Sequence, residues 1–134
     1  MIIMNINFRR LVVPSVVCAM LSIASTAVAH HSFDAEYDSR KPFTITGFVT
    51  KVDWLNPHAF VSIDVKDGNT VKNYRIEMGP PYALVRGGWK RDTLKVGDKV
   101  TVVNAAAAKD GRDAGGSMPT TAMVLADGQK LTMR

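Results

Sequence analysis

The chain has 134 residues, of which 46% are apolar and 22% are charged, and its formal net charge is +5. This length suits a single domain, and the ordinary charged fraction excludes general disorder. Six prolines and ten glycines exclude collagen-like and low-complexity chains. The composition does not point to any particular reaction.

Residues 1–29 have the three-part pattern of a secretory signal peptide. Arg9 and Arg10 precede an apolar run over residues 11–24, and the segment ends in Ala-Val-Ala at 27–29. The apolar run is too short to cross a bilayer comfortably, so we expect a cleaved signal helix rather than a retained membrane helix. The sequence therefore predicts a periplasmic protein without a stable membrane anchor after cleavage.

The only cysteine, Cys18, lies inside this apolar run. The mature chain then has no cysteine, so its core must hold the fold without a disulfide, and a cysteine nucleophile is excluded. No serine occurs in a recognisable strained-turn context, so no Ser-His-Asp set is predicted. We therefore predict no catalytic residues and expect a binding protein rather than an enzyme.

The mature chain divides into an arm and one β domain. We expect residues 30–42 to form an extended arm and residues 43–134 to form the domain. Residues 43–54 predict a long first strand with a bend near Gly47, where the apolar register changes. Strict alternation over residues 59–66 predicts a half-buried second strand.

The rest of the domain contains further strands and one short helix. In chain order we expect a hairpin turn at 67–69, a third strand at 74–78, a short helix at 81–86, a fourth strand at 99–105, a flexible loop at 109–117, a fifth strand at 120–125 and a short closing strand at 131–133. A sheet this small hides its edges most simply by closing. The predicted fold is therefore mainly β, a small OB-like barrel of five or six strands with one short helix between strands 3 and 4, and a small open sandwich is the alternative.

Three groups of residues form recognisable motifs in the mature chain. They are His30-His31-Ser32-Phe33 with Glu36-Tyr37-Asp38, then Trp54-x-Asn56-Pro57-His58-Ala59, and then Gly79-Pro80-Pro81-Tyr82-Ala83-Leu84. Together these motifs resemble a family of small exported bacterial proteins classed only as a domain of unknown function. The resemblance covers nearly all of the mature chain and implies an exported, mostly β, single-domain protein. It supplies no catalytic residues.

A weaker resemblance is to the periplasmic copper and silver chaperones that are also small OB barrels. They hold their ion with a histidine, methionines and a tryptophan, and Trp54, His58 and Met78 or Met123 supply these residue types here. The spacing does not match that motif, so no ligand assignment is carried over.

Three histidines, His30, His31 and His58, are the candidate metal ligands. If the signal is cut after Ala29, the free amine and the ring of His30 can chelate one ion, because both lose their protons near neutral pH. An all-nitrogen site favours Cu²⁺ among the divalent ions. We therefore predict copper binding through His30 with His31 or His58, copper being the only cofactor considered. The alternative is that these histidines lie in solvent without a ligand.

The segment from Trp54 to His58 is the second candidate site. Asn56-Pro57 predicts a turn between the first two strands, and in an OB barrel this loop borders the binding face. We therefore predict that Trp54, Asn56 and Phe60 lie at the mouth of a ligand site beside His58. The alternative is a corner that is shaped only by local structure. A small periplasmic ligand, a partner protein, or a periplasmic enzyme with this chain as accessory subunit all remain open.

A basic stretch follows the third predicted strand. It consists of Arg86, Lys90, Arg91, Lys95 and Lys99. OB barrels often bind single-stranded nucleic acid with such residues, but export argues against a nucleic-acid partner. We expect a solvated basic face, or weak contact with anionic lipid headgroups or cell-wall polymer.

Overall fold

The computed structural model describes residues 32–134. The expected signal peptide, His30 and His31 lie outside the described residues. Asp34–Arg134 form one compact unit. Within the described part, no helix has the length and apolar character needed to cross a membrane.

Seven strands and one helix follow the helical residues 32–36. They are β1 (Tyr37–Asp53), β2 (Phe60–Asp67), β3 (Thr70–Glu77), α3 (Pro81–Arg86), β4 (Lys99–Ala108), β5 (Ala114–Gly116), β6 (Ala122–Val124) and β7 (Lys130–Thr132). Residues 32–36 are thus helical where an extended arm was expected, and β1 begins within that arm. The start of β1 is extended because it pairs with the end of β4, with Tyr37 opposite Ala108.

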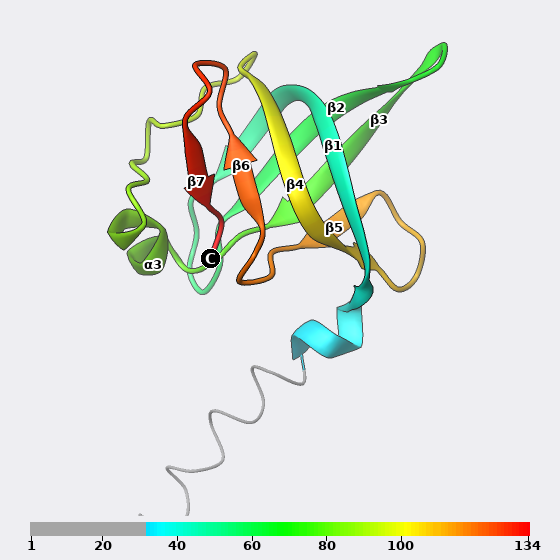
Figure 1. Ribbon diagram of the computed structural model, residues 1–134, viewed down its shortest axis with the longest axis horizontal. Coiled ribbons are helices and arrows are strands. Elements are labelled where there is room, and N and C mark those ends of the chain that lie inside the picture. The colour runs from blue at the N-terminus through cyan, green and yellow to red at the C-terminus, as the bar shows by residue number, and fades with distance from the viewer. Residues whose placement is uncertain (1–31) are drawn as a thin grey trace, which may run out of the picture. The chain divides into compact units, whose positions relative to one another are not determined.

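Five of these strands form a barrel in the order β1-β2-β3-β5-β4, and the pairing of β4 with β1 closes it (Figure 1). The β3–β5 pair is parallel and the other barrel pairs are antiparallel. The helix α3 lies between β3 and β4 in the chain. The prediction of a mainly β, OB-like barrel with one short helix between strands 3 and 4 is therefore confirmed.

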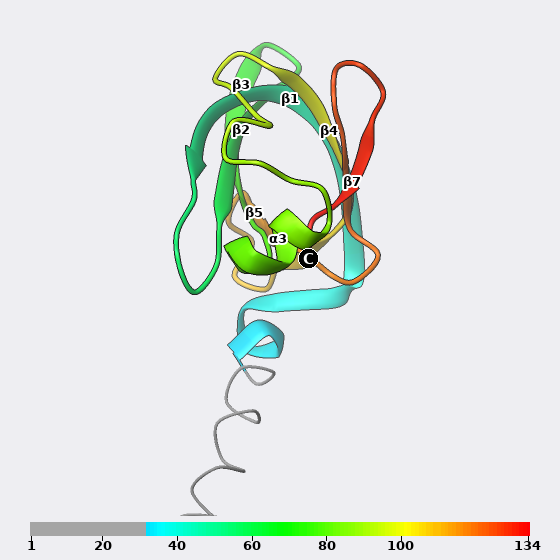
Figure 2. The same cartoon turned by 90° about the vertical axis from the view of Figure 1, so that its left-hand side faces the viewer.

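The long strand β1 serves two partners. Its first part pairs with β4 as far as Phe48, and its last part pairs with β2 from Phe48 onward. Figure 2 shows β1 curving over the top of the barrel between these two pairings. The bend requires a glycine at position 47, because a Cβ there would lie 2.1 Å from the carbonyl oxygen of Asp64. The bend that the sequence predicts near Gly47 is confirmed.

The strand that closes the barrel lies where a flexible loop was expected. Ala114–Gly116 form β5, which pairs with β3 on one side and β4 on the other. The strands expected at 120–125 and 131–133 are instead β6 and β7, which extend the sheet from β4. The loop prediction failed because β5 is short and made of small residues, so it has no apolar alternation to recognise.

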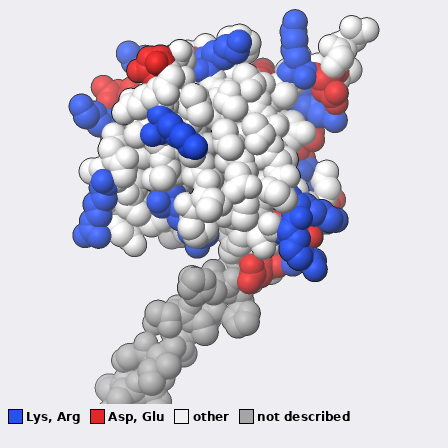
Figure 3. All heavy atoms as spheres, in the orientation of Figure 1, with Lys and Arg blue, Asp and Glu red and all other residues white. Residues whose placement is uncertain are grey.

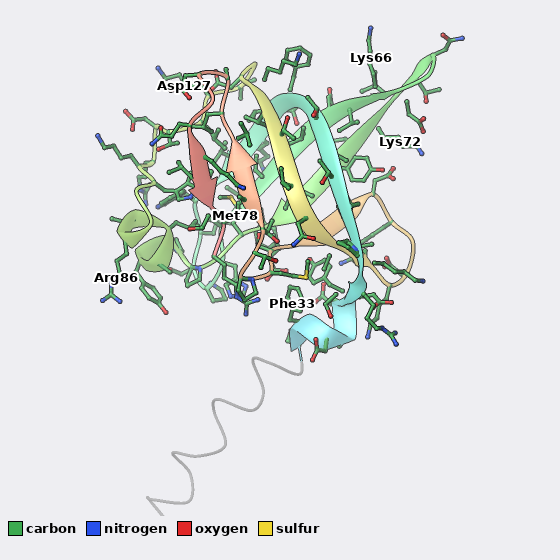
Figure 4. All side chains as sticks on the ribbon, in the orientation of Figure 1. Phe33, Lys66, Lys72, Met78, Arg86 and Asp127 are labelled. Carbon is green, nitrogen blue, oxygen red and sulfur yellow. The ribbon has the colours of Figure 1, made fainter. Side chains whose placement is uncertain are left out.

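The core fills the inside of the barrel. Val61 and Ile63 of β2 and Ile76 of β3 are fully buried, as alternation predicts. Figure 4 places Met78 in the interior, where it is 3% exposed. Trp89, which follows α3, joins the same cluster, and its Nε1 donates a 2.6 Å hydrogen bond to the carbonyl oxygen of Thr132. This contact ties the segment after α3 to β7.

Candidate functional site

The predicted ligand residues of the β1–β2 loop, residues 54–59, are not brought together. Trp54 packs partly buried against the core and lines a shallow depression with Trp89. Phe60 is partly exposed while its neighbours Ala59 and Val61 are buried, so its ring lies on the outer surface of β2. Asn56 is exposed in the loop. Trp54 and Phe60 therefore belong to different surfaces.

His58 is the one histidine among residues 32–134, and it begins a chain of three polar side chains. Its Nδ1 contacts Oε1 of Glu77, at the end of β3. The other carboxylate oxygen of Glu77, Oε2, accepts a hydrogen bond of 2.8 Å from the hydroxyl of Tyr37. Three elements that are distant in sequence thus meet at one carboxylate.

Backbone hydrogen bonds fix the position of this group. The loop end at Ala59 is tied to the residues after β3, because Met78 N donates to Ala59 O over 2.8 Å and Ala59 N donates to Gly79 O over 3.2 Å. Phe60 then pairs with Glu77 across β2 and β3. On its other side Glu77 is held by Ser117, whose backbone N and Oγ donate to the Glu77 carbonyl over 3.0 and 2.5 Å. Glu77 therefore sits on a rigid sheet, and the imidazole lies beside it.

Burial keeps the phenol of Tyr37 in its neutral form. Its side chain is 4% exposed, and this burial, together with the hydrogen bond to Glu77 and the negative charge of that carboxylate, raises the pKa of Tyr37 well above its usual value. A contact with Arg112 acts in the opposite direction and lowers that pKa by less. Near neutral pH the hydroxyl therefore remains a donor to Glu77.

The same carboxylate decides which nitrogen of the neutral imidazole carries the proton. An ionised carboxylate only accepts hydrogen bonds, so Nδ1 of His58 must be the donor. The other ring nitrogen, Nε2, then keeps its lone pair, and among the described residues it has no hydrogen-bond partner. The His58 side chain is 45% exposed, so this nitrogen belongs to a ring that solvent can reach. The arrangement presents an oriented acceptor to a ligand.

The loop between β4 and β5 borders the same chain of side chains. Arg112 of this loop pairs with Glu36 over 2.9 Å and with Asp110 over 2.6 Å. Its contact with Tyr37 places it next to the buried phenol. In OB barrels the β1–β2 and β4–β5 loops flank the ligand-binding face of β2 and β3. The His58–Glu77–Tyr37 group thus lies at the part of the fold that binds ligands in other OB barrels.

A second feature of this face is a stacked cation. The guanidinium carbon of Arg75 lies 4.2 Å from the centroid of the Phe60 ring, a cation–π contact. Asp53 at the end of β1 pairs with Arg75 over 3.7 Å and with Lys51 over 2.9 Å. Phe60 therefore presents a covered ring, and the guanidinium is the group that faces outward.

Metal ligands are scarce in the described part of the chain. Among residues 32–134, no three histidine, cysteine, aspartate or glutamate side chains form a group that could hold a metal ion. His30 and His31 lie outside the described residues. A site in which His58 is one of three such ligands therefore needs at least one ligand from beyond this part of the chain.

Glu77 and Tyr37 are the site residues that sequence reasoning missed. Tyr37 lies in one of the motifs that carry the family resemblance, but its alternation with neighbours gives no sign of its partner. Glu77 lies between Ile76 and Met78, which the apolar pattern correctly assigns to the buried face, and nothing in that pattern singles out Glu77. Their contact joins residues 40 positions apart, and only the closure of the barrel brings them together.

Comparison with known proteins adds the family and nothing about activity. A search of the curated proteins found no match, and a search of the solved structures found none. One family model matches residues 18–117, which include all five strands of the closed barrel. The resemblance to an uncharacterised family that the sequence motifs indicate is therefore confirmed, and the chain belongs to DUF6152, a family of unknown function.

Proposed function

We propose that this protein is a small exported copper-binding protein and that His58 is one of its ligands. The observation that supports this is the contact between Nδ1 of His58 and the Glu77 carboxylate. Metal-binding histidines commonly donate their second ring nitrogen to a carboxylate, which orients the ring and makes the ligating nitrogen more basic. In the half-exposed ring of His58, Nδ1 already contacts such a carboxylate.

The remaining nitrogens of the proposed site come from the mature N-terminus. His30 with a free amine, and His31 next to it, are the candidates that the sequence supplies. A set of imidazole and amine nitrogens favours Cu²⁺ over the other divalent ions. Arg75 and Arg112, the two arginines described above, are each paired with a carboxylate, which lessens their repulsion of a metal ion.

Titration of the processed protein with Cu²⁺ tests the proposal, with affinity measured by calorimetry and nitrogen ligands counted by electron paramagnetic resonance. His58→Gln is expected to remove one nitrogen from the spectrum and to weaken binding. Glu77→Gln keeps the ligand but loses its orientation, and is expected to weaken binding about tenfold. Asn56→Ala, in the same loop, is the matched control and should leave both readouts unchanged.

An added residue before His30 separates the two parts of the proposal. If binding weakens with the added residue but not with His58→Gln, copper binds the N-terminus alone and His58 is not a ligand. If neither change alters affinity or spectrum, the copper proposal is wrong.

A second candidate function is the binding of a small organic ligand on the outer face of β2 and β3. The observation that favours it is the Arg75 guanidinium stacked on Phe60, whose strand partner Glu77 also contacts His58. Such a face suits a ligand with a hydroxyl group for the imidazole and a carboxylate or flat ring for the guanidinium.

A screen of small glycans and aromatic acids by amide NMR tests this candidate on metal-free protein. A ligand of this face is expected to shift the signals of Phe60, Arg75 and the β1–β2 loop, and Arg75→Gln should weaken it. Trp54→Ala is the control, because Trp54 lies on a different surface. If no probe shifts these signals, or if Trp54→Ala weakens binding as much as Arg75→Gln, the assignment to this face is wrong.

A further inference from the structure

The segment from α3 to the start of β4 carries five basic side chains that are all exposed. They are Arg86, Lys90, Arg91, Lys95 and Lys99. Seven ion pairs occur in the described part of the chain, and none of them includes a residue of 81–99. These five charges therefore have no carboxylate partner there, unlike Arg40, Lys72 and Arg112 elsewhere on the barrel.

The acidic residues of the same segment do little to offset these charges. Oδ2 of Asp98 accepts a 2.8 Å hydrogen bond from the backbone N of Lys95, so this carboxylate stabilises the turn before β4. Asp92 is the other acidic residue of the segment. Five cations against two carboxylates leave the segment with a positive excess.

Large apolar side chains are exposed on the same segment. Val96 is 72% exposed, Tyr82 is 66% exposed and Val85 is 57% exposed. They are half of the six large apolar side chains that are exposed in the described part. The Arg86 guanidinium lies 5.8 Å from the centroid of the Tyr82 ring, so the charge and the aromatic ring are presented together. We call residues 81–99 with these side chains the α3–β4 surface.

The figures place this segment along one side of the barrel. Figures 1 and 2 show α3 and the chain that leads to β4 on the side opposite the protruding β2–β3 hairpin. Arg86 extends from α3 away from the barrel, whereas Lys66 and Lys72 lie on the hairpin (Figure 4). Figure 3 shows lysine and arginine side chains projecting from the edge where α3 lies.

We propose that the α3–β4 surface docks the protein onto an anionic phospholipid bilayer. The basic side chains contact the headgroups, while Tyr82 and Val96 enter the boundary between headgroups and acyl chains. A soluble polyanion would satisfy the charges but would leave the apolar side chains in water. A bilayer satisfies both, so the combination favours lipid. The six-residue helix α3 is far too short to insert, and the docking is peripheral and reversible.

Co-sedimentation with vesicles tests this inference. The chain from Ser32 onward is used, because it contains the whole described barrel and its core and omits the apolar residues 11–24. It is expected to bind phosphatidylcholine vesicles that contain phosphatidylglycerol, and not pure phosphatidylcholine. Two basic residues near an anionic surface contribute more than tenfold at low salt, so reversal of both in Arg91→Glu/Lys95→Glu should reduce partitioning by at least that factor.

Two further variants make the test specific. Lys41→Glu/Lys66→Glu makes the same change in net charge at two exposed lysines outside the segment, and it should bind nearly as well as the wild type. Tyr82→Ser/Val96→Ser removes apolar surface without changing charge and should also weaken binding. Equal binding to both vesicle types, or an equal loss in the control pair, would overturn the inference. Binding to dextran sulfate is a further control. If the protein binds dextran sulfate as tightly as vesicles, and Tyr82→Ser/Val96→Ser does not weaken that binding, the partner is a soluble polyanion and the inference is overturned.

Discussion

The ring of Phe43 fills the space that a side chain at Gly115 would need. A Cβ at Gly115 would lie 2.6 Å from Cζ of Phe43 and 3.1 Å from the carbonyl oxygen of Ala106. Gly115 belongs to β5, the strand that joins β3 to β4 and closes the barrel. Closure of the barrel therefore depends on a residue without a side chain.

Gly115→Ala is expected to destabilise the fold by about 1–3 kcal/mol, because the Phe43 ring and the β4 backbone must shift to admit the methyl group. Urea unfolding followed by circular dichroism measures the change. The same substitution at Gly87, where the nearest atoms are 3.3 Å from the added Cβ, is the control and should cost less. Equal losses for the two variants would contradict the packing argument.

This glycine also marks the limit of sequence-based prediction of the fold. Alternating apolar residues of β2 and β3 correctly predicted the inward face, and Pro81 followed by Gly87 correctly predicted the ends of α3. In β5, by contrast, backbone pairing and small volume take the place of apolar side chains. Its role is visible only once β3 and β4 are positioned on either side of it.

The candidate site was predictable to a smaller degree. The β1–β2 loop was correctly predicted as a turn, and His58 was singled out there. Trp54 and Phe60 were grouped with it because they are near in sequence, but they lie on different surfaces. Trp54 follows the end of β1 and packs against the core, whereas Phe60 begins β2 on its outer face. The partners of His58 come from strands that are distant in sequence, so no local sequence pattern predicts these contacts.

The indole of Trp89 gives a second test of the core. Trp89→Phe removes the hydrogen bond to Thr132 and leaves a space in the core cluster, so it is expected to destabilise the protein by about 2–4 kcal/mol. Trp54→Phe is the matched control, because that ring is only partly buried, and it should cost distinctly less. Thermal or urea unfolding of both variants decides the order, and a larger loss at Trp54 would contradict it.

Tyr37 predicts a loss of stability in strongly alkaline solution. Its folded-state pKa is raised above the unfolded value of about 10. Its neutral form is therefore favoured by folding, and the resulting stability is fully present below about pH 10 and is lost as the pH rises toward the folded-state pKa. Tyr37→Phe removes this titration and should flatten the alkaline part of the stability profile.

Near neutral pH the same variant loses the hydrogen bond to Glu77 and is expected to be about 1–2 kcal/mol less stable. Urea unfolding between about pH 8 and pH 11 compares it with Tyr82→Phe, whose ring is exposed and which should keep the wild-type profile. An alkaline decline of the same steepness in Tyr37→Phe and in the wild type would show that another group causes it.

The His58–Glu77 contact predicts an unusual state of the imidazole. Neutral histidine in water favours the proton on Nε2, but a carboxylate acceptor at Nδ1 should hold the proton there. Long-range ¹H–¹⁵N NMR spectra of the metal-free protein, recorded at a pH where the ring is neutral, should therefore show His58 in the Nδ1–H form. In Glu77→Gln, whose side-chain amide can either donate or accept, this preference should weaken, while Asp64→Asn on the same outer face should leave it intact. A wild-type ring in the Nε2–H form would mean that the lone pair lies toward Glu77, and Nε2 could not then serve as a ready-made acceptor for a metal ion or a ligand hydroxyl.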